Sequence, residues 1–306
     1  MNNVQLNHIT RSYGTIHAVR DVSLDIRSGE LFGLIGPDGA GKTTLFRILT
    51  TLLLPDSGEA KVCGLDVRKD WKEIRGIAGY MPGRFSLYQD LSVEENLRFF
   101  ATVFKTTVKE NYDLIHDIYV QIEPFAKRRA GKLSGGMKQK LALCCALIHR
   151  PRVLFLDEPT TGVDPVSRKE FWDILSRINK QGITIIVSTP YMDEASLCDR
   201  IALMKNGVCL RTDHPATISA SYPHLLWAVC GADMYSLLLD IRAYPETYSC
   251  HAFGDRHHLA LKSGKHEMND LKHFLQGRGH SNVTIEPLVP SVEDYFMNFE
   301  EDKLCM

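Results

Sequence analysis

A glycine-rich loop directly behind a short apolar run is the feature that most constrains this chain. Residues 36–43 read Gly-Pro-Asp-Gly-Ala-Gly-Lys-Thr, and residues 31–35 before them read Leu-Phe-Gly-Leu-Ile. The loop fits Gly-x-x-x-x-Gly-Lys-Thr, in which glycines let backbone N–H groups turn inward around an anion and the following helix adds its positive end. A strand, this loop and a helix in that order predict an α/β fold with a site for the phosphates of a nucleoside triphosphate.

The loop residues have distinct expected roles. Lys42 is expected to reach the β- and γ-phosphate oxygens, and Thr43 to place its hydroxyl on Mg²⁺. ATP and Mg²⁺ are therefore the expected ligands. The nucleotide-binding residues predicted in this loop are Gly36, Pro37, Asp38, Gly39, Ala40, Gly41, Lys42, Thr43 and Thr44.

An acidic pair supplies the second half of the predicted site. Residues 153–156 read Val-Leu-Phe-Leu, a buried strand by pattern, and Asp157 and Glu158 follow directly. Ligands of open parallel sheets bind at the carboxyl ends of the strands, so this pair is expected to face the glycine-rich loop. Asp157 would hold Mg²⁺ through water, and Glu158 would orient and deprotonate the attacking water.

Residues 133–136, Leu-Ser-Gly-Gly, lie between these elements at the start of a helical pattern. With the loop and the acidic strand end, this order resembles the ATP-binding-cassette (ABC) family over about residues 1–212. The resemblance implies a P-loop NTPase cassette with a RecA-like core and a helical subdomain. It also implies that the signature Ser134, Gly135 and Gly136 binds the γ-phosphate of ATP held by a different cassette, so a second cassette, of the same or a different chain, is an expected partner.

The resemblance extends to two further features. Tyr13 looks like the family's aromatic shelf for adenine, with Val19 beneath it. Residues 161–165, Thr-Gly-Val-Asp-Pro, match the loop by which paired cassettes touch, and Asp164 belongs to that contact. Asp164 before Pro165 is also an ordinary helix start, and both interpretations can hold together.

Two positions depart from the family pattern. Where members usually carry a glutamine after Gly-Tyr-x-x, this chain has Gly83, and where a histidine normally follows the strand at 183–189, it has Pro190. Losing one donor aimed at transition-state charge typically costs about 3 kcal/mol. The chain's own site is therefore expected to bind ATP well and to hydrolyse it slowly.

Glu158 and the intact signature leave several arrangements open. A partner's phosphate loop facing this signature could make a fully active site in an asymmetric pair. A homodimer with two slow sites, helped by Arg84 or Gln89, is the competing arrangement. A chain that binds ATP without turnover and regulates an active partner is a further alternative. Soluble DNA-repair or translation ATPases built on the same cassette fit less well. Only 157 − 42 = 115 positions separate Lys42 from Asp157, which leaves no room for a long coiled-coil insertion.

The composition limits the cellular compartment and the kinds of partner that this chain can have. No apolar run approaches the roughly 18 residues that span a bilayer, and the N-terminus has no basic and apolar leader. The expectation is a cytoplasmic subunit on the inner face of the cell membrane, with a separate membrane-spanning permease. The formal net charge of −1 gives no basic footprint for nucleic acid. Eight cysteines without Cys-x-x-Cys spacing are expected to be reduced, buried apolar residues.

The pattern along the chain predicts two parts, a cassette at 1–212 and an accessory domain at 213–306. Ser92 and Glu95 are spaced as a capping box at the start of an all-helical subdomain at about 92–149. Phe85, Leu87 and Tyr88 could line a groove for the membrane subunit, although ordinary core packing is the commoner role. The last part is expected to be a small α/β appendage. Its ending, Pro-Ser-Val-Glu-Asp-Tyr-Phe at 290–296, resembles the tail of drug-resistance-type exporter cassettes, which favours export over import.

Overall fold

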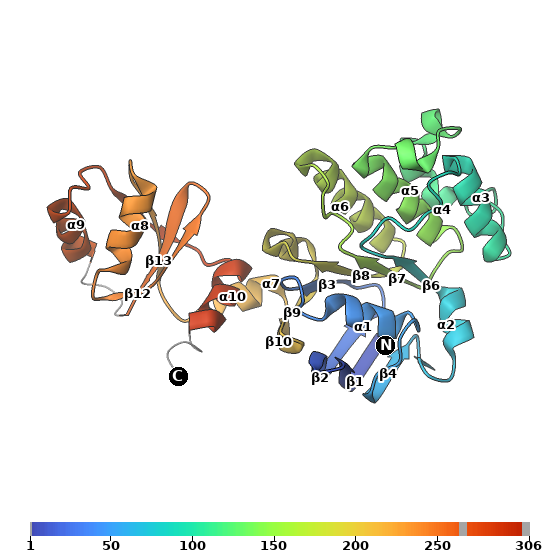
Figure 1. The fold of residues 1–306 in the computed structure, drawn as a ribbon, viewed down its shortest axis with the longest axis horizontal. Helices are drawn as coiled ribbons and strands as arrows, with labels where there is room; N and C mark the ends of the chain where they lie inside the picture. The colour runs from blue at the N-terminus through green and yellow to red at the C-terminus, as the bar shows by residue number, and fades with distance from the viewer. Residues whose placement is uncertain (1, 263–267, 302–306) are drawn as a thin grey trace. The chain divides into compact units, whose positions relative to one another are not determined.

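The chain forms two units, shown in a computed structural model that describes residues 2–262 and 268–301 (Figure 1). By internal contacts the first unit ends at His214 and the second begins at Pro215. The first unit contains two sheets and the second contains one, and each unit has its own hydrophobic core.

A six-stranded sheet forms the centre of the first unit. Its order is β10-β9-β3-β8-β7-β6, and all strands are parallel except the edge strand β10. Strands β3, β7 and β8 are buried at every position, which explains their continuous apolar sequences. Because they are parallel neighbours, the loops that follow them emerge at one edge of the sheet. The strands are β3 (Leu31–Ile35), β6 (Ala78–Met81), β7 (Val153–Asp157), β8 (Thr184–Thr189), β9 (Arg200–Lys205) and β10 (Val208–Asp213).

A second, antiparallel sheet lies on the other side of helix α1 (Lys42–Leu49). Helix α1 contacts β2 and β4 of this sheet and β7 of the central sheet, so it is buried between the two layers, as Figure 1 shows. Phe46 of α1 meets Phe155 of β7 edge-on, with ring centroids 5.7 Å apart. This packing fixes the start of α1 against the central sheet. The antiparallel strands are β1 (Asn2–Tyr13), β2 (Ile16–Arg27), β4 (Ser57–Val62) and β5 (Leu65–Asp66), and helix α2 (Trp71–Ile77) leads into β6.

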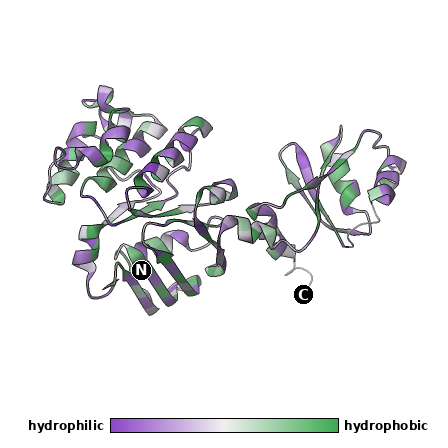
Figure 2. Cartoon of the chain, turned by 180° about the vertical axis from the view of Figure 1, so that it is seen from behind, coloured by the Kyte–Doolittle hydropathy of each residue, from purple (hydrophilic) through white to green (hydrophobic). Residues whose placement is uncertain are grey.

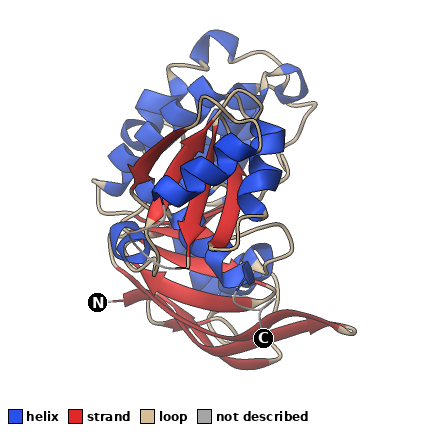
Figure 3. Ribbon diagram, turned by 90° about the vertical axis from the view of Figure 1, so that its left-hand side faces the viewer, coloured by secondary structure: helices blue, strands red, loops and turns tan. Residues whose placement is uncertain are grey.

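Helices cover the opposite face of the central sheet (Figures 1 and 3). α5 (Gly135–Leu147) contacts β6, α6 (Pro165–Asn179) contacts β8, and α3 (Val93–Val103) and α4 (Tyr112–Tyr119) pack on α5. The predicted capping box is confirmed, because the amide of Glu95 donates to Ser92 Oγ and the amide of Ser92 donates to Glu95 Oε2. Short 3₁₀ turns occupy Glu123–Phe125, Ala130–Lys132 and Met192–Leu197. None of the helices in the described part of the chain has the length and apolar character needed to cross a bilayer.

The second unit is a four-stranded antiparallel sheet in the order β12-β13-β11-β14. Helices α8 and α9 contribute Leu237 and Leu271 to a core with Val229 and Leu259 of the sheet. In Figure 2 the helices carry both green and purple, as amphipathic helices do. The elements are α7 (Pro215–Ala220), β11 (Leu226–Cys230), α8 (Met234–Arg242), β12 (Thr247–Phe253), β13 (Arg256–Leu261), α9 (Met268–Gly277), β14 (Thr284–Leu288) and α10 (Val292–Glu301).

The ending at 290–296 has a structural role inside this unit. The Ser291 hydroxyl and amide both donate to Asp294 Oδ2, and the Asp294 amide donates back to Ser291 Oγ, which fixes the start of α10. Oδ1 of the same carboxylate lies 2.6 Å from Nδ1 of His258 on β13. Burial raises the pKa of Asp294, but the hydrogen bonds from His258 and Ser291 outweigh burial and lower it overall. Asp294 thus joins α10 to the sheet.

We expect Asp294→Asn to loosen α10. A buried carboxylate that accepts several hydrogen bonds typically contributes about 1 to 3 kcal/mol. Because the pKa of Asp294 is lowered in the folded chain, this contribution is present at neutral pH and is lost as the pH falls through the folded-state value. Hydrogen exchange of the backbone at 291–301 should be faster in the variant at pH 7. Glu286→Gln, an exposed change on β14, is the control, and equal protection in both variants would contradict the assignment.

Candidate nucleotide-binding site

The glycine-rich loop connects β3 to α1, as predicted. Gly41 is the N-cap of α1 with φ of 101°, and a Cβ there would lie 2.3 Å from the carbonyl oxygen of Ala18. Only glycine fits this position. Pro37, Asp38 and Gly39 are exposed at the tip of the loop, whereas Gly36, Ala40 and Thr44 are buried at its base. The loop thus has an exposed tip and a base that is packed into the fold.

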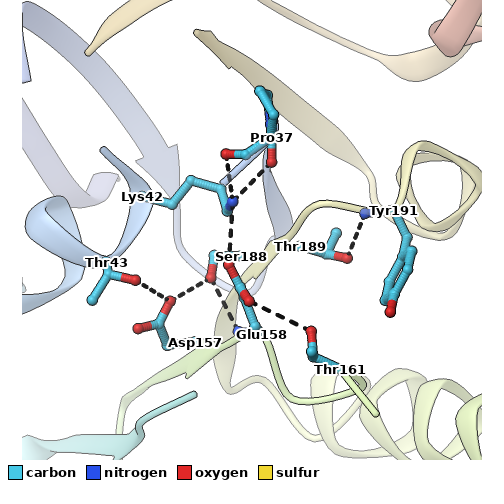
Figure 4. A network of polar contacts seen from close by, with 10 residues as sticks. Pro37, Lys42, Thr43, Asp157, Glu158, Thr161, Ser188, Thr189 and Tyr191 are labelled. Carbon is cyan, nitrogen blue, oxygen red and sulfur yellow. Dashed lines mark hydrogen bonds and ion pairs between the residues drawn. The ribbon is translucent and has the colours of Figure 1, made fainter. Parts of the chain in front are cut away.

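The side chain of Lys42 is only 3% exposed, and its ammonium group contacts three oxygen atoms. Its ammonium donates to the carbonyl oxygens of Gly36 at 2.8 Å and Pro37 at 3.1 Å, and lies 3.2 Å from Glu158 Oε1 (Figure 4). These partners compensate the cost of burying the charge. A phosphate that binds Lys42 has to replace or share these oxygens, and the contact with Glu158 is the one a phosphate oxygen can most readily replace.

Thr43 and Asp157 meet as the sequence predicts. Thr43 Oγ1 donates to Asp157 Oδ1 at 3.1 Å, and Ser188 Oγ donates to the same oxygen at 2.6 Å. Asp157 is buried, so these bonds fix its carboxylate in place. Hydroxyl and carboxylate oxygens are the ligands that Mg²⁺ takes beside phosphates and water, so this donor set fits the metal.

Glu158 occupies a strained backbone position at the end of β7. Its φ is 50°, in the left-handed region that few non-glycine residues adopt. The amide of Glu158 donates to the backbone oxygen of Ser188 at 3.0 Å and to Ser188 Oγ at 3.1 Å. These bonds to β8 hold the turn, which aims the carboxylate at Lys42.

A cavity of about 470 Å³ opens over the loop. Its lining includes Gly39 to Thr44, Glu158, and residues that the sequence did not indicate: Ile16, His17, Ala18, Arg20 and Asn206. Tyr13 and Val19 are not part of this lining. Tyr13 is half-exposed with the Arg11 guanidinium over its ring, and Val19 is buried in the core. Stacking of adenine on Tyr13 stays a prediction.

The signature and the paired-cassette loop lie beside one another. Ser134 is the N-cap of α5 and accepts from the amide of Met137, and Asp164 is the N-cap of α6 and accepts from the amide of Ser167. A Cβ on Gly136 would lie 3.1 Å from Ser167 Oγ, so the two helix starts are close neighbours. The signature does not line the cavity over the glycine-rich loop. Binding of a phosphate at the signature therefore stays a prediction, and it would involve a surface other than the lining of this cavity.

Gly83 lies beside the acidic pair. A Cβ at this position would be 3.0 Å from the carbonyl oxygen of Asp157 and 3.8 Å from Glu158 Cβ. Any side chain here would crowd the backbone at the end of β7. Nearby, burial and the Asp157 carboxylate raise the pKa of Tyr80 to about 12, and Arg47 acts in the opposite direction. The phenol of Tyr80 is thus a neutral hydrogen-bond donor near Asp157.

Pro190 directly follows β8, and the segment after it is held by Arg168 of α6. The Arg168 guanidinium lies over the ring of Tyr191 and makes ion pairs with Asp193 and Glu194. Glu194 is buried and accepts from Thr160 Oγ1 at 2.8 Å. No sequence pattern indicated this link between α6 and the segment after Pro190, because an arginine on a helix is usually a solvated surface residue.

A second, apolar cavity of about 380 Å³ lies between the central sheet and the helices. It is lined by Leu52, Leu87, Phe100, Val103, Phe104 and His149, among others. The His149 ring stacks on Phe104 at 3.8 Å, and burial lowers the pKa of His149 to about 4 against the opposing bond to the Ala78 carbonyl. His149 is therefore neutral at physiological pH. Phe85 and Tyr88 do not line this cavity, whereas Leu87 does.

Comparison with known proteins agrees with this geometry. Residues 19–161 match the family described as ABC transporter. The chain is 40% identical over 219 residues to the probable multidrug ABC transporter ATP-binding protein YbhF of Escherichia coli (strain K12), a match that covers 71% of this chain and 38% of YbhF. The chain therefore spans well under half the length of that relative. It is 33% identical over 305 residues to the Nod factor export ATP-binding protein I of Rhizobium sp. (strain N33), covering 96% of this chain and 95% of the relative.

Solved structures show the same fold. CbiO1 of Clostridium perfringens, described as part of the ABC transporter complex cbiONQ, is 28% identical with a TM-score of 0.65, covering 72% of this chain and 91% of CbiO1. MJ0796, a bacterial ABC transporter cassette with a dimeric structure, is 27% identical with a TM-score of 0.62, covering 69% of this chain and 98% of MJ0796. The fold, the shared motifs and a relative matched over nearly its full length lead to one conclusion: the chain belongs to the ABC transporter family, as one of its ATP-binding proteins.

Proposed function

We propose that this chain is the ATP-binding subunit of an export transporter, in which ATP–Mg²⁺ closes a pair of cassettes and hydrolysis reopens them. The observation that carries the proposal is the meeting of Lys42 and Thr43, which follow β3, with Asp157 and Glu158 at the end of β7. Ser188 of β8, the strand between these two, bonds Asp157. The names of the relatives above, one for multidrug transport and one for Nod factor export, favour export as the direction.

The residues of this site can divide the work of ATP hydrolysis. When bound, Mg²⁺ would neutralise charge on the β- and γ-phosphates, and Thr43 and Asp157 are the residues that would hold it. Lys42 would exchange Glu158 for phosphate oxygens. Glu158, released from that ion pair, would then be free to accept a proton from the attacking water. Ser188 keeps Asp157 and the turn at Glu158 in register.

The own site is proposed to be slow because Gly83 and Pro190 supply no side-chain donor. Ser134, Gly135, Gly136 and Asp164 remain available to complete a site with a partner cassette, whether a second copy or a different chain. The dimeric cassette among the solved structures supports pairing. A subunit that binds ATP without turnover and regulates an active partner is the alternative, favoured by the same two replacements and opposed by the retained Glu158.

A membrane-spanning permease is the second proposed partner. The apolar cavity at Leu52, Phe100 and Phe104 is a surface that an apolar helix end of such a subunit fits, and CbiO1 is described as part of a transporter complex. Docking there would place the chain at the inner face of the cell membrane. The cassette is assigned to 1–212 and the accessory domain to 213–306, and nucleic acid is not a proposed partner.

Nucleotide binding by the full-length chain is the first test of this function. Lys42→Ala should weaken ATP–Mg²⁺ binding by about tenfold or more, because charge-assisted bonds to phosphate are lost. Lys69→Ala, an exposed change away from both cavities, should leave the affinity unchanged. Isothermal titration calorimetry measures both. Absence of binding in the unaltered chain, or equal binding by the two variants, would contradict the proposal.

Restoring the missing groups tests the slow site. Pro190→His should raise ATP turnover of the purified chain by about tenfold or more, since one donor to transition-state charge is typically worth 10²- to 10³-fold. Gly83→Gln should help less, because its Cβ must displace the Asp157 carbonyl. Gly83→Ala carries the same Cβ without the amide and is its control. Steady-state phosphate release measures the turnover of all three variants. If Pro190→His gives no gain, the lack of a histidine at position 190 does not limit the rate.

A further inference from the structure

A third cavity, of about 560 Å³, adjoins the nucleotide site on the side of Gly83. It shares Thr43 and Glu158 with the cavity over the glycine-rich loop. Asp157 and two arginines, Arg47 and Arg84, also line it. The proposed function gives Thr43, Asp157 and Glu158 a role but leaves the two arginines without one.

Both arginines are placed to act on the same ligand as Thr43. Arg47 lies four residues after Thr43 on α1, so the two side chains share a face of the helix one turn apart. Arg84 directly follows Gly83 at the rim of the cavity. Both side chains are exposed, and within residues 2–262 and 268–301 neither makes an ion pair with a carboxylate. They contrast with Lys42, whose ammonium already has three oxygen partners.

The glycine at position 83 keeps this cavity open. A Cβ there would contact the Asp157 carbonyl at 3.0 Å, with Glu158 Cβ at 3.8 Å, so a longer side chain would occupy space next to the two carboxylates. With glycine, that space is left between the carboxylates and the arginines. The replacement that removes a donor therefore also leaves room for a ligand.

The charges of the cavity indicate which ligand fits. The formal charges of the two guanidinium groups and of the Asp157 and Glu158 carboxylates sum to zero. A bound Mg²⁺ would therefore leave an excess of positive charge in the cavity. A phosphate dianion would neutralise that excess. Guanidinium groups suit it, since each offers several N–H donors in a planar fork that matches phosphate oxygens.

We propose that Arg47 and Arg84 form a phosphate-accepting pocket beside the nucleotide site. The phosphate is either the γ-phosphate of ATP held by the glycine-rich loop or the inorganic phosphate released from it. The inference rests on the proposed function, because both sources require a nucleotide at Lys42 and Thr43. In this chain, the guanidinium groups of Arg47 and Arg84, which line the cavity beside Gly83, help to hold the terminal phosphate.

The test uses the full chain with Arg47→Gln, Arg84→Gln and the double change, which remove charge while keeping polar side chains. Arg177→Gln, an exposed change on α6, is the matched control. Calorimetry measures three affinities for each protein: ATP–Mg²⁺, ADP–Mg²⁺, and inorganic phosphate added to the chain saturated with ADP–Mg²⁺. Thermal unfolding checks that each variant is as stable as the unaltered chain. If Arg47→Gln on α1 reduces the stability, the affinities of Arg84→Gln alone decide the test.

The outcomes separate the two phosphate sources. If the pocket holds the γ-phosphate, the affinity for ATP falls by about tenfold or more while that for ADP stays within about twofold of the control. If the pocket holds released phosphate, ATP affinity is unchanged, and the unaltered chain binds inorganic phosphate beside ADP whereas the Arg84→Gln variant does not. Affinities equal to those of Arg177→Gln in all three titrations overturn the pocket while leaving the proposed function intact. Failure of the unaltered chain to bind either nucleotide overturns both.

Discussion

The hydrogen bonds on Asp157 tie together the parts of this protein that act on a nucleotide. Thr43 comes from the helix after β3, Asp157 ends β7 and Ser188 lies in β8, and one carboxylate oxygen accepts from both hydroxyls. Because the carboxylate is buried, it needs these donors to offset the loss of water. The same bonds fix the spacing between the glycine-rich loop and Glu158. A change in any of the three strand ends would therefore alter the geometry around Lys42.

Gly83 and Pro190 stand at this edge and change its chemistry in different ways. Pro190 has no side-chain donor, and Arg168 holds the segment after it through Tyr191, Asp193 and Glu194. Gly83 removes a side chain and leaves a cavity faced by arginines. The proposed binding of ATP and closure of paired cassettes rest on the glycine-rich loop and on Ser134, Gly135 and Gly136, whose motifs are complete in this chain. The slow turnover proposed above is attributed to the two replaced groups, so the proposal predicts that binding and turnover can be separated in this chain.

The motif at the end of the chain shows how a family likeness can have a local physical reason. Ser291 and Asp294 cap each other at the start of α10, and Asp294 also reaches His258 on the sheet. The spacing of serine and aspartate in the sequence is that of a helix cap, but the partner on β13 lies 36 residues away. The contacts of this motif lie within the second unit, and its link to export stays a prediction.

Sequence patterns were enough to predict the family, the order of strands and helices around the loop, and the meeting of Lys42, Thr43, Asp157 and Glu158. These features rest on local patterns: glycines that a turn requires, apolar runs of buried strands, and a cap such as that of Ser92 with Glu95. The folded chain was needed to see that Ser188 bonds Asp157 and that Arg168 holds the segment after Pro190. It was also needed to see that Val19 is buried in the core and that Arg47 and Arg84 line one cavity. These contacts join residues far apart in the chain, and their geometry depends on packing between layers, which no local pattern encodes.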